Sequence, residues 1–343
     1  MKVVYDRKKE GIRILRCFGY DGQAELPDAI DGCPVTELGP YLFAETVRRF
    51  EPGEVLMAEV SGEAGREAHS LKGGRIGDGS WKEMEALEDG TPVLRGVGLR
   101  ALSLPSRLEK IGAYACYNCE NLEEITFSWS LRDLGAGLFT GCHGIRRLNV
   151  SLPPGRQCCL KEMLAELRQT LKVTILDGQG QVQAKLLFPE YYEEAIENTP
   201  ARILTQEMHG CGHRYRNAFS GKDFQYLVYD KLFPHIKVQE KPELVTELVL
   251  GRLMYPVMLQ DERKEIYEEY AAAHGREIVR VAKEGQEMDI LRFAARAPWC
   301  GVGCLEEMLE EARQEGNAQF LGFLMDVRHE RKASPKGRRR FEL

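Results

Sequence analysis

The chain has 343 residues, of which 43% are hydrophobic and 29% charged, a balance typical of a globular protein long enough for two domains. Its net charge of −6 excludes a chain that binds polyanions over its whole surface. No apolar run reaches the roughly 18 residues of a transmembrane helix, and the charged start predicts no secretory leader. Ten cysteines in a chain interpreted as leaderless predict reduced thiols and a cytoplasmic location.

An internal repeat predicts the fold of the N-terminal half. Residues 108–127 align with residues 131–150 at an offset of 23, which places Gly112 on Gly135. We expect both glycines at a tight bend where a side chain would clash. Each unit ends in a short strand whose leucine-type residues point inward and whose intervening residues point outward. No single unit can bury its own apolar face, so the units should stack into a solenoid.

Two earlier copies of the repeat are degraded. One lies at residues 34–45 and carries Leu38 and Gly39 in the Ile-Gly positions. The other is interpreted as divided, with its front half at residues 75–87 and its strand at residues 99–104. About a dozen further residues then separate the two halves of that unit.

Cys116 and Cys119 form a Cys-x-x-Cys pair, the spacing of half a zinc site or of a redox pair. The repeat places Cys116 where other units have Phe43 and Phe139, and Cys119 where the next unit has Cys142. Buried free cysteine behaves as a small hydrophobe. We therefore interpret the pair as core residues, with metal or redox chemistry as the alternative.

The pattern Ile-Gly-x-x-x-Phe-x-x-Cys-x-x-Leu-x-x-Ile resembles the BspA-like leucine-rich repeats, a repeat of bacterial type, over roughly residues 11–150. The stretch ELPDAIDGCPVTELG, residues 25–39, looks like the usual opening of that family. The resemblance implies a solenoid and a binding surface, often on the cell exterior in members of the family. It implies no particular activity.

The outward positions of the predicted strands carry charged residues. Glu123 and Glu124 lie one period from Arg146 and Arg147, and Arg100 lies one period before Glu123, so basic and acidic side chains should alternate on adjacent parallel strands. Such pairs can simply keep a sheet soluble; the functional alternative is a polar recognition surface. The candidate binding surface comprises Arg100, Glu123, Glu124, Thr126, Arg146, Arg147 and Asn149.

An insertion and a cap complete the predicted first domain, residues 1–177. Residues 51–74 are rich in Gly and Glu with little periodicity, so we expect a mobile insertion near 47–74 that leaves the solenoid. An apolar helix stripe and the strand LKVTIL then predict a C-terminal cap over residues 158–177.

A helical-repeat domain is predicted over residues 178–329. It begins with a possible strand at residues 182–188, and helical periodicity is expected from about Pro189. Ser220 with Asp223 fits a capping box, and further helix starts are expected at Pro242 and at Asp261. Residues 276–297 and 305–326 align at an offset near 30, which predicts two helix pairs.

The predicted fold class is α+β. A leucine-rich-repeat solenoid of BspA-like type with short strands is followed by an all-α domain, which is ankyrin-like or an irregular helical array. The basic segment 330–343 is expected to be a disordered tail. It could contact nucleic acid or an acidic protein, and a solvated tail without a partner is the alternative.

One segment could bind a metal ion. His209, Cys211 and His213 alternate and would share a face if the segment were extended, and imidazole with thiolate suits zinc. A polar loop with surface histidines is the alternative. Cys300 and Cys304 are interpreted as packing residues.

We find no Walker loop, dinucleotide fingerprint, His-Glu-x-x-His motif or Gly-x-Ser-x-Gly elbow, and we assign no catalytic residue and no cofactor. The predicted function is therefore a non-enzymatic protein-protein interaction or scaffold protein. Its partner is another protein, with no membrane and no nucleic acid except through the tail. The alternative is a metal-binding regulatory or hydrolytic helical domain that uses His209, Cys211 and His213.

Overall fold

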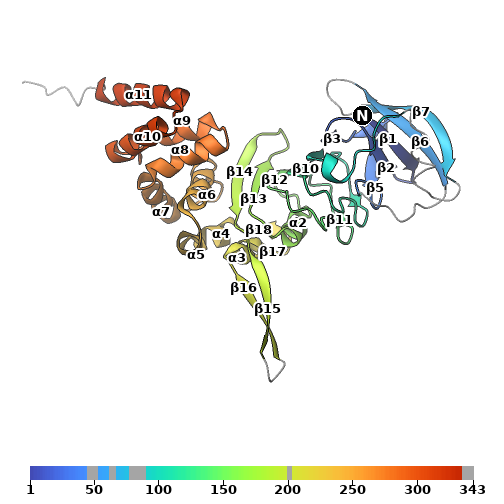
Figure 1. Cartoon of the computed structure of the whole chain (residues 1–343), viewed down its shortest axis with the longest axis horizontal. Helices are drawn as coiled ribbons and strands as arrows, with labels where there is room; N and C mark the ends of the chain where they lie inside the picture. Colours follow the sequence, from blue (N-terminus) through green and yellow to red (C-terminus); the bar gives the residue numbers. More distant parts are fainter. Residues whose placement is uncertain (45–52, 62–66, 77–89, 199–202, 334–343) are drawn as a thin grey trace, which may run out of the picture. The chain divides into compact units, whose positions relative to one another are not determined.

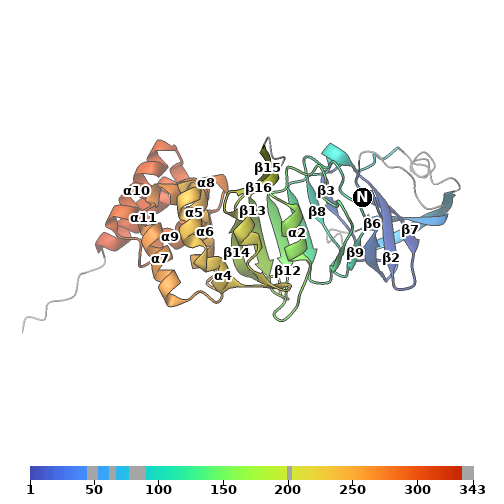
Figure 2. The same ribbon diagram turned by 90° about the horizontal axis from the view of Figure 1, so that it is seen from below.

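The structure is a computed structural model of the whole chain, shown in two views (Figures 1 and 2). It describes residues 1–44, 53–61, 67–76, 90–198 and 203–333. The chain divides into two compact units. The first comprises Met1–Gln183 and Phe188–Gln225, and the second comprises Ala184–Leu187 and Tyr226–Leu343.

A six-stranded sheet carries the repeat in the first unit, with the strand order β14-β13-β12-β10-β8-β3. Neighbouring strands from β3 to β13 are parallel. The register pairs Ile125 with Leu148 and Phe127 with Val150, which confirms the predicted offset. The strands are β3 (Gln23–Glu25), β8 (Ala101–Ser103), β10 (Glu124–Ser128), β12 (Arg147–Ser151), β13 (Leu171–Leu176) and β14 (Val182–Phe188).

The inward side chains of these strands form the core of the solenoid. Leu102, Ile125, Leu148 and Val173 follow one another across the sheet and are all buried. The helix and the strand predicted for residues 158–177 are present as α2 (Leu160–Glu166) and β13, and β14 continues the sheet beyond β13. Because the apolar positions repeat, the inward face of each strand is buried together with those of the neighbouring units.

A second sheet of eight strands has the order β11-β9-β5-β2-β1-β6-β7-β4. It contains the front part of each repeat, since Leu38 pairs with Ile111 and Ile111 pairs with Leu134. Its strands are β1 (Lys2–Arg7), β2 (Ile12–Phe18), β4 (Ala29–Ile30), β5 (Cys33–Leu38), β6 (Gly53–Ser61), β7 (Glu67–Ile76), β9 (Lys110–Ile111) and β11 (Asp133–Leu134).

The divided repeat unit was assigned wrongly. Because β5 pairs directly with β9, the unit at residues 34–45 stacks on the unit at 108–127 with no other front half between them. Arg75 and Ile76 instead end β7, which pairs with β6. Residues 77–87 of the predicted front half, including Trp81 in its aromatic position, lie outside the described residues.

Where the structure describes the insertion, it forms strands instead of the aperiodic loop that was predicted. Residues 53–61 and 67–76 form the antiparallel pair β6 and β7, and β6 pairs with β1. Val55 and Met57 are buried and pack with Phe18. A short alternation of apolar residues therefore outweighed the Gly- and Glu-rich composition. Residues 47–52 and 62–66 lie outside the described part.

Residues after Pro189 do not become helical at once, contrary to the prediction. β15 (Tyr192–Asn198) and β16 (Ile203–His209) form a two-stranded antiparallel ribbon (Figure 1). Ser220 and Asp223 belong to the short hairpin of β17 (Phe219–Ser220) and β18 (Asp223–Phe224), so the predicted capping box was wrong. The helices of this region are α3 (Gly212–Arg216), α4 (Tyr226–Lys231) and α5 (Phe233–Gln239).

Helix pairs build the second unit. The predicted starts at Pro242 and Asp261 are confirmed. Helices α6, α8 and α10 pack in succession, and α9 packs against α11. The amides of Glu287 and Asn317 donate to the carbonyls of Ala282 and Ala312, the same bond 30 residues apart. The helices are α6 (Pro242–Met254), α7 (Asp261–Ala272), α8 (Gly275–Glu284), α9 (Met288–Arg296), α10 (Val302–Gln314) and α11 (Ala318–Ala333).

Candidate functional site

The outward side chains of the parallel sheet form two rows across strands β3 to β13, which we call the strand face. They point outward because the alternate positions on each strand are buried in the core. The first row is Gln23, Ala101, Glu124, Arg147 and Lys172. The second row is Glu25, Ser103, Thr126, Asn149 and Thr174.

Glu124 is the centre of a polar network on this face. The Nε of Arg147 donates to its Oε2 at 2.8 Å, and the Nδ2 of Asn149 donates to its Oε1 at 2.7 Å. The same Nδ2 lies 3.3 Å from Oγ1 of Thr126. Arg147 also lies 3.6 Å from the carboxylate of Glu123. The predicted contact between the acidic pair and the next strand is confirmed, and it holds these side chains in one arrangement.

The stability gained from this network is small, because its members are accessible to water. The side chains of Arg147 and Glu124 are 50% and 33% exposed, and ion pairs with this exposure contribute about 0.2–1 kcal/mol. The network therefore orders polar groups at the surface more than it stabilises the fold.

Arg100 and Arg146 precede their strands and are exposed. The carbonyl of Arg100 accepts from the amide of Glu123, and the carbonyl of Glu123 accepts from the amide of Arg146. The three residues therefore follow one another through adjacent units in the predicted order of basic, acidic and basic. Their role in binding stays a prediction.

The strand face is hollowed over β3, β8 and β10. A cavity of about 170 Å³ lies there, with the small residues Ala101 and Ser103 at its centre and the carboxylates of Glu25 and Glu124 on either side. Gln23 and Thr126 complete its polar lining. The arrangement can accept a cationic side chain at the hollow, while Arg147 presents the opposite charge on the next strand.

Our sequence reasoning missed Gln23, Glu25, Ala101 and Ser103. Residue 23 pairs with residue 101, which lies 78 positions later. One signal could have found this pairing. The sequence AELP at residues 24–27 has the same inward-outward alternation and terminal Leu-Pro as LSLP at residues 102–105.

The cysteines of the CYNC segment pack in the core, as predicted. Cys116 and Cys119 are both buried. The thiol of Cys119 donates to the backbone carbonyl of Phe43 at 3.4 Å, and the thiol of Cys142 donates to the backbone carbonyl of Cys116 at 2.9 Å. Burial raises the pKa of Cys116, which keeps its thiol neutral. All ten cysteines are free, and Cys300 and Cys304 are buried in the core of the second unit.

The predicted metal segment does not have the expected geometry. His209 ends β16, the chain turns at Gly210 with φ +84°, and His213 lies in α3. His209 stacks on Tyr192 with ring centroids 4.7 Å apart, and Cys211 is buried. The premise of an extended segment was therefore wrong. Among the residues that the structure describes, no three His, Cys, Asp or Glu side chains are grouped to hold a metal ion.

No helix in the described part of the chain is both long and apolar enough to cross a membrane.

Comparison with known proteins identifies the repeat. Residues 93–162 match the family described as "BspA type Leucine rich repeat region (6 copies)". This part of the chain thus carries leucine-rich repeats of BspA type. No curated protein matches the chain.

One solved structure that matches is a leucine-rich repeat protein of T. pallidum. It is 19% identical, and the match covers 42% of this chain and 67% of the other. Its TM-score of 0.18 is too low for any argument from that structure.

Proposed function

We propose that the chain is a non-enzymatic protein-interaction or scaffold protein whose strand face binds another protein. Leucine-rich repeats of this type in residues 93–162 support a role in protein interaction in general. The observation that carries the proposal is the hollow beside the ordered Glu124 network. A preformed polar surface loses little side-chain freedom on binding.

The proposed contact residues combine predicted and newly observed positions. The hollow would take a Lys or Arg side chain of the partner between Glu25 and Glu124. Acidic groups of the partner would face Arg147 on the neighbouring strand. The full proposed set is Arg100, Glu123, Glu124, Thr126, Arg146, Arg147 and Asn149, with Gln23, Glu25, Ala101 and Ser103.

The helical unit is proposed to be a second interaction module of ankyrin-like or related type. This rests on the helix pairs that repeat with an offset of 30 between Ala282 and Ala312, against about 33 residues for ankyrin repeats. A cytoplasmic location is proposed from the ten free cysteines, since disulfides are rare in that compartment.

The strand face can be tested by filling its hollow. The full chain is used to capture partners from an extract of cells that express it, and Ala101→Arg is compared with His143→Arg. Each substitution introduces one arginine, but His143 is exposed on the loop before β12 and lies outside the two rows. We expect a protein recovered by the natural chain to be lost with Ala101→Arg and kept with His143→Arg. Equal recovery by both variants would refute binding at the hollow.

A further inference from the structure

A second cavity of about 380 Å³ lies in the first unit, away from the two rows of the strand face. Two segments line it: Trp129 and Arg132 shortly after β10, and residues 155–158 just before α2. Lys222, from the turn between β17 and β18, completes the lining. Its charged lining residues are Arg132, Arg156 and Lys222, and no carboxylate lines it. A cavity with this lining attracts anions.

Arg156 and Arg132 are arranged around one indole ring. The guanidinium carbon of Arg156 lies 4.3 Å from the ring centroid of Trp129, and that of Arg132 lies 5.9 Å from it. A guanidinium that stacks on an aromatic ring uses its face and leaves the N–H donors at its edge free for hydrogen bonds. The indole therefore orients Arg156 while its donors remain available.

The backbone around Arg156 is also held in place. Its amide donates to the carbonyl of Pro153 at 3.1 Å, in a turn where Gly155 has φ +76°. Pro154 restricts the same turn. The amide of Trp129 donates to the carbonyl of Ser151 at 2.9 Å, which anchors the ring at the end of β10. Backbone hydrogen bonds thus hold both Arg156 and the ring of Trp129 in position.

Neighbouring acids offset only part of the positive charge. Lys222 lies 3.1 Å from the carboxylate of Glu162, and Gln157 donates to Asp223 at 2.9 Å. Within the described residues, the side chains of Arg132 and Arg156 make no ion pair, and both are exposed. Two guanidiniums near one ring repel each other, and an oxyanion between them would remove that repulsion.

We propose that this cavity binds an oxyanion carried by a peptide, either a side-chain carboxylate or a phosphorylated side chain. The planar donor fork of arginine matches the paired oxygens of both groups. Recognition of acidic or phosphorylated segments by arginine clusters is a general mode of peptide binding. This site is separate from the strand face, so either can fail without the other.

The test uses the fluorescence of Trp129. The chain has three tryptophans, so the full-length variant with Trp81→Phe and Trp299→Phe leaves Trp129 as the only reporter. It is titrated with three peptides of equal length, which carry two glutamates, one phosphoserine or two glutamines, and with inorganic phosphate. We expect saturable changes with the two anionic peptides and none with the glutamine peptide. The anionic peptide that binds with the higher affinity shows whether the oxyanion is a carboxylate or a phosphate.

Substitutions in the same background assign the site. Arg156→Gln and Arg132→Gln should each weaken binding about tenfold or more, the usual effect of a lost charge-assisted bond. Arg313→Gln is the matched control, since Arg313 is exposed on α10 in the other unit and its loss should change affinity less than about twofold. Circular dichroism shows whether each variant is folded.

Three results would overturn the proposal. The first is an equal response to the glutamine peptide, and the second is unchanged affinity in both arginine variants. The third is binding of inorganic phosphate as tight as that of the phosphoserine peptide, which would show that the cavity does not recognise a peptide.

Discussion

At the scale of single residues, two glycines allow the repeat units to stack. A Cβ on Gly135 would lie 2.3 Å from the amide nitrogen of Ala113, and one on Gly112 would lie 2.4 Å from that of Pro40. Both obstacles are backbone atoms of the preceding unit, which cannot turn aside as a flexible side chain can. The expected clash is therefore confirmed, and its cause is the close approach of consecutive units.

We predict that Gly135→Ala lowers the free energy of unfolding of the first unit by about 1–3 kcal/mol or more, the cost of overpacking a close contact. Gly98→Ala is the matched control, because a Cβ at Gly98 meets no atom within 4 Å. It should change stability by less than about 0.5 kcal/mol. Urea unfolding followed by circular dichroism measures both. Equal effects of the two substitutions would show that the stacking contact is not tight.

A buried ion pair holds three helices of the second unit. Arg252 donates to both oxygens of Asp230, at 2.8 and 2.9 Å, and the hydroxyl of Tyr267 donates to the same carboxylate at 3.0 Å. Both charged side chains are fully buried. Burial alone would lower the pKa of Arg252, but its bonds to Asp230 outweigh burial and raise it.

We predict that Asp230→Ala costs about 3–5 kcal/mol, because it leaves the guanidinium of Arg252 buried without its partner. Tyr267→Phe removes one bond to the same carboxylate and keeps the ion pair, so it should cost about 0.5–1.5 kcal/mol. Urea titrations of both variants give the comparison. A cost of Asp230→Ala no larger than that of Tyr267→Phe would contradict the role of the pair.

At the scale of elements, the ribbon of β15 and β16 has little to stabilise it. It is a separate two-stranded sheet, and such ribbons are marginal in water. Tyr192 stacks on His209 at its base, but further along Glu194 lies directly opposite Glu207. Like charges in that position destabilise a strand pair, and the Nε2 of His209 lies 3.1 Å from the carboxylate of Glu194.

We predict that Glu207→Gln slows hydrogen exchange of the ribbon amides by about two- to fivefold, because it removes the like-charge pair. Gln206→Lys is the matched control: it changes the net charge equally, but residue 206 lies opposite Ala195. Its exchange rates should stay close to those of the natural chain. Equal slowing in both variants would indicate a general charge effect instead of a cross-strand one.

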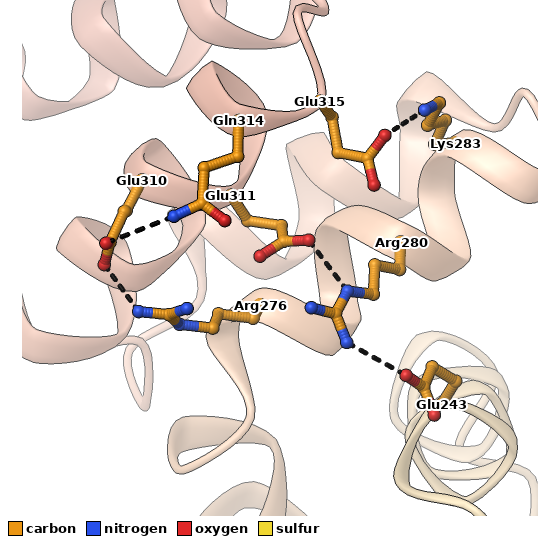
Figure 3. A network of polar contacts seen from close by, with 8 residues as sticks. All are labelled: Glu243, Arg276, Arg280, Lys283, Glu310, Glu311, Gln314 and Glu315. Carbon is orange, nitrogen blue, oxygen red and sulfur yellow. Dashed lines mark hydrogen bonds and ion pairs between the residues drawn. The ribbon is translucent and has the colours of Figure 1, made fainter.

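At the scale of the whole molecule, each of the two units buries a core of its own, and the second adds a polar network across its packed helices (Figure 3). Arg280 on α8 donates to Glu311 on α10 at 2.7 Å and to Glu243 on α6 at 3.0 Å. Arg276 on α8 pairs with Glu310 on α10, and Lys283 on α8 pairs with Glu315, which directly follows α10. One helix therefore joins both of its neighbours through charge.

The network should make the helical unit sensitive to acid. A backbone hydrogen bond and the guanidinium of Arg280 lower the pKa of Glu243, and the ammonium of Lys283 lowers the pKa of Glu315. A lowered folded pKa contributes stability above the unfolded pKa, and this contribution is lost as the pH falls through the folded pKa. We therefore predict that the second unit loses stability between about pH 5 and pH 3.

Arg280→Gln should lower stability at pH 7 and reduce the loss of stability on acidification. The substitution removes the guanidinium, which is one of the causes that lower the pKa of Glu243. Urea unfolding at pH 7, 5 and 3, followed by helical circular dichroism, measures this. Arg313→Gln, exposed on α10, should leave the pH dependence unchanged. The same pH dependence in all three chains would rule out the network as its source.

The sequence by itself determined the repeat and much of the strand face. A constant offset places residues such as Glu124 and Arg147 on adjacent strands, because stacked units keep the same register. Alternation along each strand determines which side chains are buried, since successive residues point to opposite faces. The glycine positions follow from the same stacking. All of these are consequences of short-range pattern.

Only the tertiary structure decided which distant strands meet. β3 joins β8, β5 stacks on β9 and β6 joins β1. The offset of 23 residues does not reach β3, so apart from the likeness of AELP to LSLP nothing placed Gln23 and Glu25 at the hollow. Strand partners are chosen by surfaces that fit in three dimensions, and local pattern carries little record of that choice. The ribbon of β15 and β16 was missed because its described side chains, at residues 192–195 and 206–209, are not buried, and a strand pair with such residues shows no apolar alternation.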